Sequence, residues 1–367
     1  MTAFGNVAGA LCGLVAALAA QALPARAEPV VEMPVAPPGV TLDTGQTLVR
    51  IALGSCAGQD QPQDFWSAIA ATRPQLLLMM GDNVYGDYGW QGDAHLGSFR
   101  TAYAKLARHR AFQDIRAHVP MRAVWDDHDF GPNDSGGDFV FKTFSEQVFE
   151  AFWGSAKTVR SRPGIYDSVM IGPEGRRVQI ILLDTRYFRS PLQEVDKSRP
   201  PVRGRYWASD DPHAQMLGEV QWRWLAQELA KPVELRLIVS SIQVLSQAHN
   251  FERWANFPNE RRRFLSMLSD ANGGQSIILS GDRHSAAIYR YALPEKSGDV
   301  WEFTSSSFNR PNRDRDVDKH EPDPLRVTEL IPETNFGLID LDWAKRQAIM
   351  RVLNDTGQEI YSYALGF

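Results

Sequence analysis

Between residues 48 and 290, short apolar runs alternate with stretches in which apolar residues recur at helical spacing. The apolar runs predict seven strands, at 48–56, 75–82, 121–129, 165–172, 176–186, 235–245 and 276–284. Helical spacing predicts five helices, at 63–73, 98–119, 144–154, 213–230 and 259–271. This alternation predicts an α/β domain, in which helices cover the faces of a sheet.

After residue 290 the pattern changes to strands with short connections. Apolar and alternating runs predict strands at 299–308, 336–343, 347–355 and 359–365. No segment with the composition of a linker lies between this part and the preceding α/β part. We therefore predict one domain over 48–367 with a β-rich C-terminal part, preceded by an extended, Pro- and Val-rich lead-in at 28–47.

Five of the predicted strands end on polar side chains. In chain order these side chains are Cys56; Asp82; Asp126, Asp127 and His128; Asp184 and Arg186; Asp282 and His284. Ligands of α/β sheets bind in the crevice outside the carboxyl ends of the strands. If the five strands are parallel, these groups converge in space.

Such a convergence would bring four carboxylates, those of Asp82, Asp126, Asp127 and Asp282, within several ångströms of one another. Like charges at that range repel strongly in a partly desolvated site, so the carboxylates stay ionised only if cations neutralise them. Carboxylates, imidazoles and one thiolate are all metal ligands. Each motif alone has an ordinary explanation, such as a turn, a helix cap or a buried cysteine. Their joint placement predicts a metal centre.

Composition narrows the class of protein. The chain has 367 residues, is 43% hydrophobic and 23% charged, and carries a formal net charge of −5. The apolar content is sufficient for a large core. The net negative charge gives no nucleic-acid-binding signature, because surfaces that bind nucleic acids are normally basic.

The N-terminal residues predict a targeting signal. An apolar stretch too short to span a bilayer comfortably ends at Ala25 and Ala27, which have the A-x-A spacing of a cleavage site. We expect cleavage near Ala27, with residues 1–27 as a signal peptide and a periplasmic or secreted mature chain without a membrane span. The alternative is an uncleaved N-terminal anchor. Cleavage would remove Cys12 and leave Cys56 as the single cysteine.

Linked motifs carry a resemblance to a known family. They are "LGSCAG", "MMGDNVYGDYG", "VWDDHDFGPND", "ILLDTRYFRSPL", "SSIQVL", "FERWANFPNERRRFL" and "LSGDRHSAA", in that order over most of residues 48–290. The chain resembles the PhoD-like alkaline phosphatases of the metallophosphoesterase (calcineurin-like) superfamily. That resemblance implies an α/β fold with a four-layer αββα sandwich, in which helices flank two β-sheets.

The resemblance also implies a set of site residues and cofactors. Metal ions would be iron and calcium, with Asp82 as the bridging carboxylate and with Cys56 and Tyr85 as iron ligands. Because "GDNVYGDY" departs from the family's usual string, the tyrosine ligand could instead be Tyr88. The further implied ligands are Asp127, Asn133, Asp282 and His284. His128 would act beside the leaving group, and Asp126 and Arg186 would contact the phosphate.

These residues predict a metal-dependent phosphoester hydrolase of the alkaline phosphatase D type. A metal-activated hydroxide would attack phosphorus, and His128 and Arg186 would stabilise the developing charge. The expected partner is a small phosphate ester, and a phosphodiesterase or phospholipase-type activity on the same site stays open because the arginine-containing loop at 189–213 could shape the pocket. GxxxxGK[ST] and GxSxG motifs are absent.

Two alternatives belong to other classes. In a Cys56 hydrolase, His128 or His284 would serve as the base, and the activity would resist chelators but not alkylation. A non-catalytic periplasmic metal-binding protein would bind metal without turning over an aryl phosphate.

Overall fold

The computed structural model describes residues 1–2, 5, 31–198, 203–293 and 298–367. The predicted signal peptide and the cleavage site near Ala27 therefore lie almost entirely outside the described residues. Contacts divide the chain into two units, Met1–Glu32 and Met33–Phe367, and the second contains the helices and strands of the described residues. A helix long and apolar enough to span a bilayer is absent from the described part of the chain.

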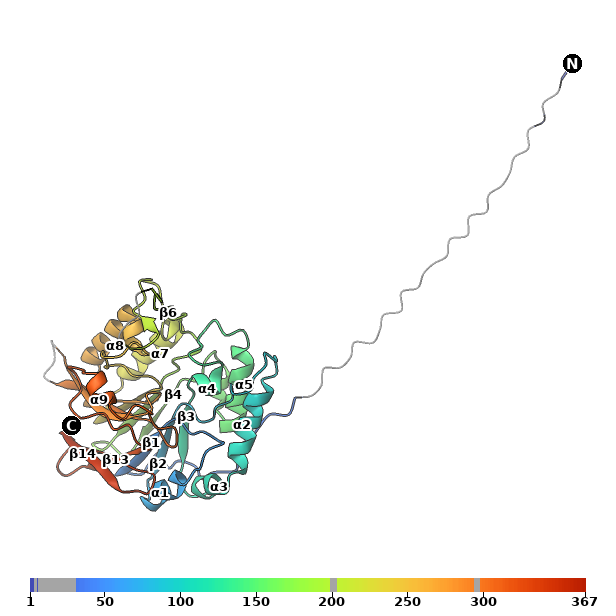
Figure 1. Cartoon of the computed structure of the whole chain (residues 1–367). Coiled ribbons are helices and arrows are strands. Elements are labelled where there is room, and N and C mark those ends of the chain that lie inside the picture. Colours follow the sequence, from blue (N-terminus) through green and yellow to red (C-terminus); the bar gives the residue numbers. More distant parts are fainter. Residues whose placement is uncertain (3–4, 6–30, 199–202, 294–297) are drawn as a thin grey trace. The chain divides into compact units, whose positions relative to one another are not determined.

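Two six-stranded sheets form the centre of this body (Figure 1). The first has the order β14-β13-β12-β1-β2-β3, with bounds Glu359–Gly366, Gln347–Leu353, Phe336–Asp342, Arg50–Gly54, Leu76–Met80 and Met121–Val124. The second has the order β10-β11-β9-β8-β5-β4, with bounds Ala286–Ala292, Asp299–Ser305, Gln275–Ser280, Leu235–Ser240, Val178–Leu182 and Asp167–Ile171. A small antiparallel pair joins β6 (Gln193–Glu194) to β7 (Tyr206–Trp207).

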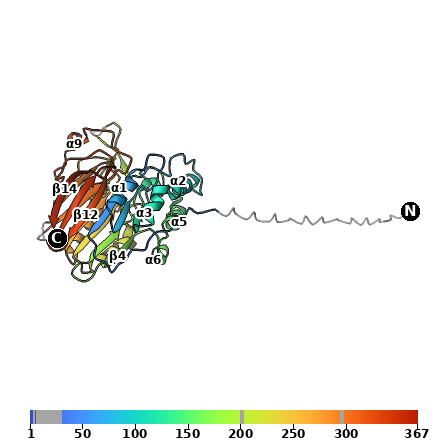
Figure 2. The same cartoon turned by 90° about the horizontal axis from the view of Figure 1, so that it is seen from below.

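Helices flank both sheets. Their bounds are α1 Phe65–Ala71, α2 Gly97–Arg108, α3 Arg110–Arg116, α4 Asp127–Phe130, α5 Lys142–Trp153, α6 Lys157–Arg160, α7 Gly218–Leu229, α8 Pro258–Asp270 and α9 Val317–His320, with one 3₁₀ turn at Trp254–Asn256. Figure 1 shows α7 and α8 together on one flank and α2 and α5 on another, and Figure 2 shows α2, α3 and α5 grouped beside the strands.

Successive residues along the strands of the second sheet belong alternately to two hydrophobic cores, so both faces of this sheet are buried. Ile180, Leu237 and Ile277 belong to the core that the two sheets share. The next residues along, Ile181, Ile238 and Ile278, belong to a second core with α7 and α8. Successive strand residues point to opposite faces. The result is the predicted four-layer αββα sandwich.

Parallel pairing brings the carboxyl ends of six strands to one region. In the first sheet β1, β2 and β3 are mutually parallel, with Gly54 opposite Met79 and Met80 opposite Val124. In the second sheet β5, β8 and β9 are parallel, with Ser240 opposite Ser280. The predicted convergence of strand ends therefore involves both sheets rather than one.

Some predicted elements differ from the structure. The helix predicted at 98–119 is broken at His109, whose extended backbone (φ −69°, ψ 119°) ends α2 and starts α3. The break lets Phe112 and Ile115 of α3 enter the core. The helix predicted from residue 213 begins only at Gly218, which has φ +69°. Strand β10 and the short helix α4 were not predicted as separate elements.

Candidate metal centre

The candidate ligands lie on turns that directly follow the strands. Cys56 follows β1, Asp82 follows β2, and Asp282 and His284 follow β9. Backbone hydrogen bonds join these turns, from Cys56 N to Gly81 O (3.4 Å) and from Ala57 N to Asp82 O (2.8 Å). The two sheets are joined here by the Ser241 hydroxyl, which donates to Asp126 Oδ1 at 2.6 Å.

Unusual backbone conformations concentrate at these turns. Eight described residues other than glycine have φ in the left-handed region, and four of them are predicted ligands: Cys56 (φ 59°), Asp82 (49°), Asp282 (64°) and His284 (54°). Such conformations cost energy for residues with a Cβ and persist where the surroundings enforce them, often at functional sites. The chain therefore holds these side chains in conformations that an ordinary turn would not require.

Gly81 permits the close approach of strands that the site needs. Its φ is +101°, and a Cβ there would lie 2.6 Å from Asp126 Cβ and 3.1 Å from Ser241 Cβ. No other residue fits that space without displacing Asp126 or Ser241. Gly81 thus lets the Asp82 turn sit against the ends of β3 and β8.

Two adjoining groups of side chains could hold metal ions. In the first, single ligand atoms of Cys56, Asp82 and His284 lie within 4.8 Å of one another. In the second, Asp126, Asp127 and Asp282 meet the same limit, and Asp82 also groups with Asp127 and His128. Asp82 and Asp127 therefore lie where one carboxylate could serve both groups.

The charges of these groups do not balance within the protein. Burial raises the pKa of Asp82 well above its usual value, and the neighbouring Asp127 and Asp126 raise it further although His128 opposes them. Burial likewise raises the pKa of Asp282, with Asp127 adding to the shift. A bound cation would relieve both effects, because it replaces lost solvation and screens the repulsion between carboxylates.

Several buried oxygen atoms at the centre have no hydrogen-bond partner. They are Tyr85 Oη, Asn83 Oδ1, Asp126 Oδ2 and Asp127 Oδ1. Buried polar atoms are normally paired, so each unpaired one requires an explanation. Oxygen donors beside a thiol and an imidazole fit a site for one or more metal ions.

Tyr85 and Tyr88 lie in different environments. Tyr85 is 2% exposed, and its ring centroid lies 4.2 Å from that of His128. Burial raises the pKa of its phenol, and the nearby Asp82 and Cys56 raise it further. Tyr88 is 54% exposed, and its hydroxyl accepts a hydrogen bond from Arg310. The structure therefore places Tyr85, not Tyr88, beside the cluster.

The pKa values of the two histidines are shifted in opposite directions. His284 Nδ1 contacts the carbonyl of Arg310, and burial lowers its pKa to about 4, so the ring is neutral as a ligand must be. His128 Nδ1 lies 2.8 Å from Asp87 Oδ1. Burial alone would lower the pKa of His128, but Asp127, Asp82 and Asp87 raise it to about 11.

Arg186 and Asp126 are turned into the protein. Both side chains are completely buried. Arg186 Nε donates to Asp126 Oδ1 at 2.7 Å, and its Nη1 lies 2.7 Å from Glu252 Oε2. Asp184, the other polar residue after β5, lies outside the metal groups and accepts hydrogen bonds from Trp125 Nε1 and the backbone of Arg186, both at 2.9 Å.

A pocket of about 630 Å³ opens beside the cluster. Asn133, Asp282 and His284 line it, so three predicted ligands face this space. Its wall is rich in arginine, namely Arg203, Arg205, Arg283, Arg310 and Arg313. Arg205 belongs to the loop predicted to shape the pocket, whereas Arg199 lies outside the described residues.

Sequence reasoning missed two acidic residues of the site. Glu252 and Asp134 form a further group with Asp127, again within 4.8 Å. Glu252 is 2% exposed and lies 3.0 Å from Arg189 Nε. Glu252 follows no strand, which hid it from the strand-end argument, although it stands in the quoted motif "FERWANFP". Asp134 directly follows Asn133.

Comparisons with known proteins agree with this geometry. A model of the PhoD-like phosphatase family matches residues 51–352. A solved structure of PhoD is similar to the chain with a TM-score of 0.66 and 16% identity. The similarity covers 90% of this chain and 69% of the PhoD chain. The structure of a dimetal phosphatase from Danio rerio is similar with a TM-score of 0.50 and 13% identity. This similarity covers 88% of this chain and 100% of the Danio rerio chain. No curated protein is similar enough in sequence to match.

Proposed function

The chain belongs to the PhoD-like phosphatase family and is therefore a phosphoric ester hydrolase, and from this premise we propose a two-metal mechanism and a set of residues that carry it. One observation supports the proposal above the others. Side chains from the ends of β1, β2, β3 and β9 form adjoining groups around buried oxygen atoms that lack partners.

We assign Cys56, Tyr85, Asp82 and His284 to one metal ion. A thiolate, a phenolate and an imidazole suit iron in its ferric state. Asp127, Asn133 and Asp282 would hold a second ion, and their oxygen donors suit calcium. Asp82 would bridge the two. When bound, these ions would lower the pKa of water and neutralise the phosphoryl oxygens.

His128 is the proposed proton donor to the leaving oxygen. Asp87 accepts from its Nδ1, which fixes the ring orientation and leaves Nε2 for the leaving group. Asp87, which belongs to neither proposed metal group, raises the pKa of the ring and so favours the protonated form that a general acid needs.

Arg186 is better suited to positioning than to phosphate contact. Because its guanidinium is fully buried between Asp126 and Glu252, we propose that Arg186 fixes Asp126 and, through it, the turn that carries Asp127. Asp126 shares that structural role. The exposed arginines of the pocket, such as Arg205, are the proposed contacts for the phosphate anion.

The substrate is proposed to be a small phosphate ester. A diester or phospholipid remains a second candidate, because the 630 Å³ pocket has room for a second substituent next to its arginine wall. We also propose that residues 1–27 are removed as a signal peptide and that the mature chain acts in the periplasm or outside the cell.

Elemental analysis of the purified full chain tests this proposal when it is combined with turnover of aryl phosphate mono- and diesters before and after chelation. We expect bound metal, and activity that chelation removes and metal restores. Activity that survives chelation but not alkylation would instead indicate a Cys56 hydrolase. Bound metal without turnover of either ester would indicate a non-catalytic binding protein.

A further inference from the structure

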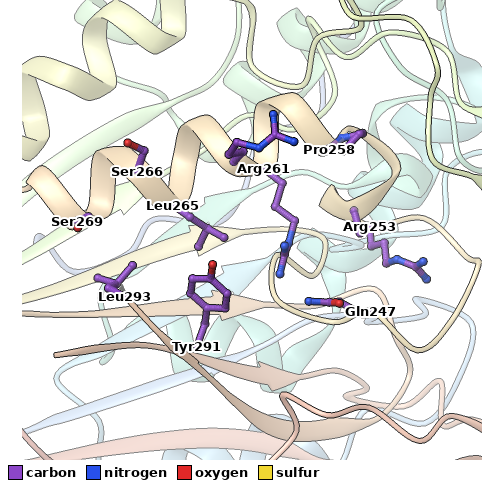
Figure 3. A pocket seen from close by; sticks show the side chains of 11 residues that line it. Gln247, Arg253, Pro258, Arg261, Leu265, Ser266, Ser269, Tyr291 and Leu293 are labelled. Carbon is purple, nitrogen blue, oxygen red and sulfur yellow. The ribbon is translucent and has the colours of Figure 1, made fainter. Parts of the chain in front are cut away.

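A second cavity lies apart from the metal cluster. It has a volume of about 560 Å³ and lies between helix α8, the end of strand β10 and the segment that follows β8. Figure 3 shows side chains of α8 facing Tyr291 and Gln247 across this space. None of its lining residues lines the pocket beside the metal centre.

Three arginines line this cavity and no acidic residue does. They are Arg253, Arg261 and Arg262. Among the ion pairs of the described residues, none involves any of the three. The next arginine of the same helix, Arg263, lies outside the cavity and pairs with Glu219. The three cavity arginines therefore form no direct ion pair, and the guanidinium of Arg261 donates to the carbonyl oxygens of Val244 (2.6 Å) and Leu245 (3.2 Å).

Two carboxylates close to the cavity accept hydrogen bonds from the backbone. Asp323 Oδ2 accepts hydrogen bonds from the backbone of Gln247 (2.6 Å) and of Ala248 (3.1 Å). Glu302 accepts from the backbone of Val244 (2.9 Å) and of Leu245 (2.6 Å). Neither carboxylate forms a direct ion pair with a cavity arginine, although both lie near enough to act on the charge of Arg261.

Arg253 has unmet hydrogen-bonding capacity. Its side chain is 8% exposed, and its Nε and Nη1 have no hydrogen-bond partner. Its Nη2 has one long contact, 3.4 Å from Asn250 Oδ1. Leaving donors of a buried cation unpaired is costly. An oxyanion in the cavity would supply the acceptors, since guanidinium groups bind oxyanions through paired N–H bonds.

The rest of the wall is largely apolar. Leu265, Leu293 and the ring of Tyr291 line it, and the Arg261 guanidinium lies 5.9 Å from the centroid of that ring. In the view of Figure 3 the side chain of Gln247 falls between those of Arg261 and Arg253. A ligand with an anionic head and a flat apolar body would match both parts of the wall.

We propose that this cavity is a second ligand site, separate from the metal centre, for a small organic oxyanion. A phosphate- or phosphonate-type head would lie at the arginines, and an aromatic or aliphatic body would pack against Tyr291 and Leu293. The site goes beyond the proposed hydrolysis, because it contains no candidate metal ligand and no proton donor of the reaction.

Isothermal titration of the full-chain, metal-loaded protein with phenylphosphonate tests the proposal. This probe cannot be hydrolysed as an ester and carries both the head and the body. We expect two sites in the wild-type protein. Gln247→Glu adds a carboxylate among the arginines at unchanged size, so one site should remain or the second should weaken at least tenfold. The matched control Gln227→Glu makes the same change on the exposed face of α7 and should keep two sites.

Two further variants separate this proposal from that of the metal centre. Asp82→Asn should lose the metal-centre site and keep the cavity site, whereas Arg262→Gln should weaken only the cavity site. The proposal is overturned if Gln247→Glu and Arg262→Gln bind as the wild type does, or if Asp82→Asn binds no phenylphosphonate. If Asp82→Asn binds as many phenylphosphonate molecules as the wild type, the metal centre does not bind phosphonate, and the proposal for the metal centre is contradicted instead.

Discussion

Arg186 and Asp126 form a fully buried ion pair that joins the carboxyl ends of the two sheets, with Nε 2.7 Å from Oδ1. Asp126 follows β3 of the first sheet, and Arg186 follows β5 of the second. Glu252 lies on the other side of the same guanidinium, 2.7 Å from Nη1. The relative position of the sheets at the metal centre therefore depends on this arginine together with the Ser241 hydroxyl, which also bonds Asp126.

Replacing this arginine should destabilise the protein strongly. Arg186→Met leaves the buried Asp126 without its counter-ion and leaves Glu252 with Arg189 alone, and breaking a buried pair in this way costs about 3–5 kcal/mol. Urea unfolding of purified variants measures the change. Arg110→Met is the control. Arg110 and its partner Asp114 are both exposed, and an exposed ion pair contributes about 0–1 kcal/mol to the free energy of unfolding. Equal losses of unfolding free energy for the two substitutions would show that Arg186 does not hold the ends of the two sheets in position.

Asp82→Asn should abolish both metal content and turnover. Asp82 lies within 4.8 Å of ligand atoms in both metal groups, and an amide supplies neither the charge nor the second donor oxygen of a bridging carboxylate. Metal analysis and aryl phosphate hydrolysis check this expectation. Asp184→Asn is the matched control, because Asp184 also follows a buried strand but bonds Trp125 and backbone amides. A folded Asp82→Asn protein that retains activity would exclude the bridging role.

The sequence predicted the grouping of the site residues because that grouping depends on where the strands end. Parallel strands deliver the residues at their carboxyl ends to one edge of a sheet, and here the carboxyl edges of two sheets bring Cys56, Asp82, Asp127 and Asp282 together. The motifs predicted the PhoD-like family, which the family model confirms over residues 51–352. The four-layer arrangement followed from that resemblance and is confirmed by the two buried faces of the second sheet.

Other features depend on tertiary packing that no local pattern reveals. Glu252 reaches the site from a segment between β8 and α8, so no strand-end rule could locate it. Arg186 and Asp126 occupy strand-end positions like the ligands, yet they turn inward because each neutralises the other. The break at His109 also escaped the periodicity, since α2 and α3 both continue the helical spacing of apolar residues.

Asp87→Asn should lower turnover while leaving the metals bound. Asp87 contacts His128 at 2.8 Å and belongs to none of the metal groups among the described residues. Losing the carboxylate lowers the pKa of His128 and weakens its orientation, so we expect a fall in kcat of about 10²-fold. The loss should be larger for alkyl esters, whose leaving oxygens need a proton, than for nitrophenyl esters.

Equal losses for both leaving groups would show that His128 does not protonate the leaving oxygen. His128→Asn is the companion variant and should show the same dependence on leaving group. Its metal content must be measured as well, because His128 also lies within 4.8 Å of ligand atoms of Asp82 and Asp127. A variant that loses metal would report on the centre and not on proton transfer.

The buried His249 should make the stability of the fold depend on pH. Its side chain is 2% exposed, Nδ1 accepts from Phe251 N at 3.2 Å, and Nε2 therefore donates to Gln243 Oε1 at 2.9 Å. Burial lowers its pKa well below the usual value, and Arg283 and Arg253 lower it further. The folded protein thus holds His249 neutral, whereas the unfolded chain protonates it near pH 6.5.

The sign follows from this difference. A group with a lowered pKa in the folded state contributes its full stability above the unfolded value and loses it as the pH falls, at about 1.4 kcal/mol per pH unit. His249→Gln removes this contribution, so the free energy of unfolding should fall less steeply below pH 6.5 than in the wild type. Urea unfolding between pH 5 and 8 measures both slopes. The exposed His213→Gln should keep the wild-type slope, and parallel slopes for His249→Gln and the wild type would show that His249 does not contribute.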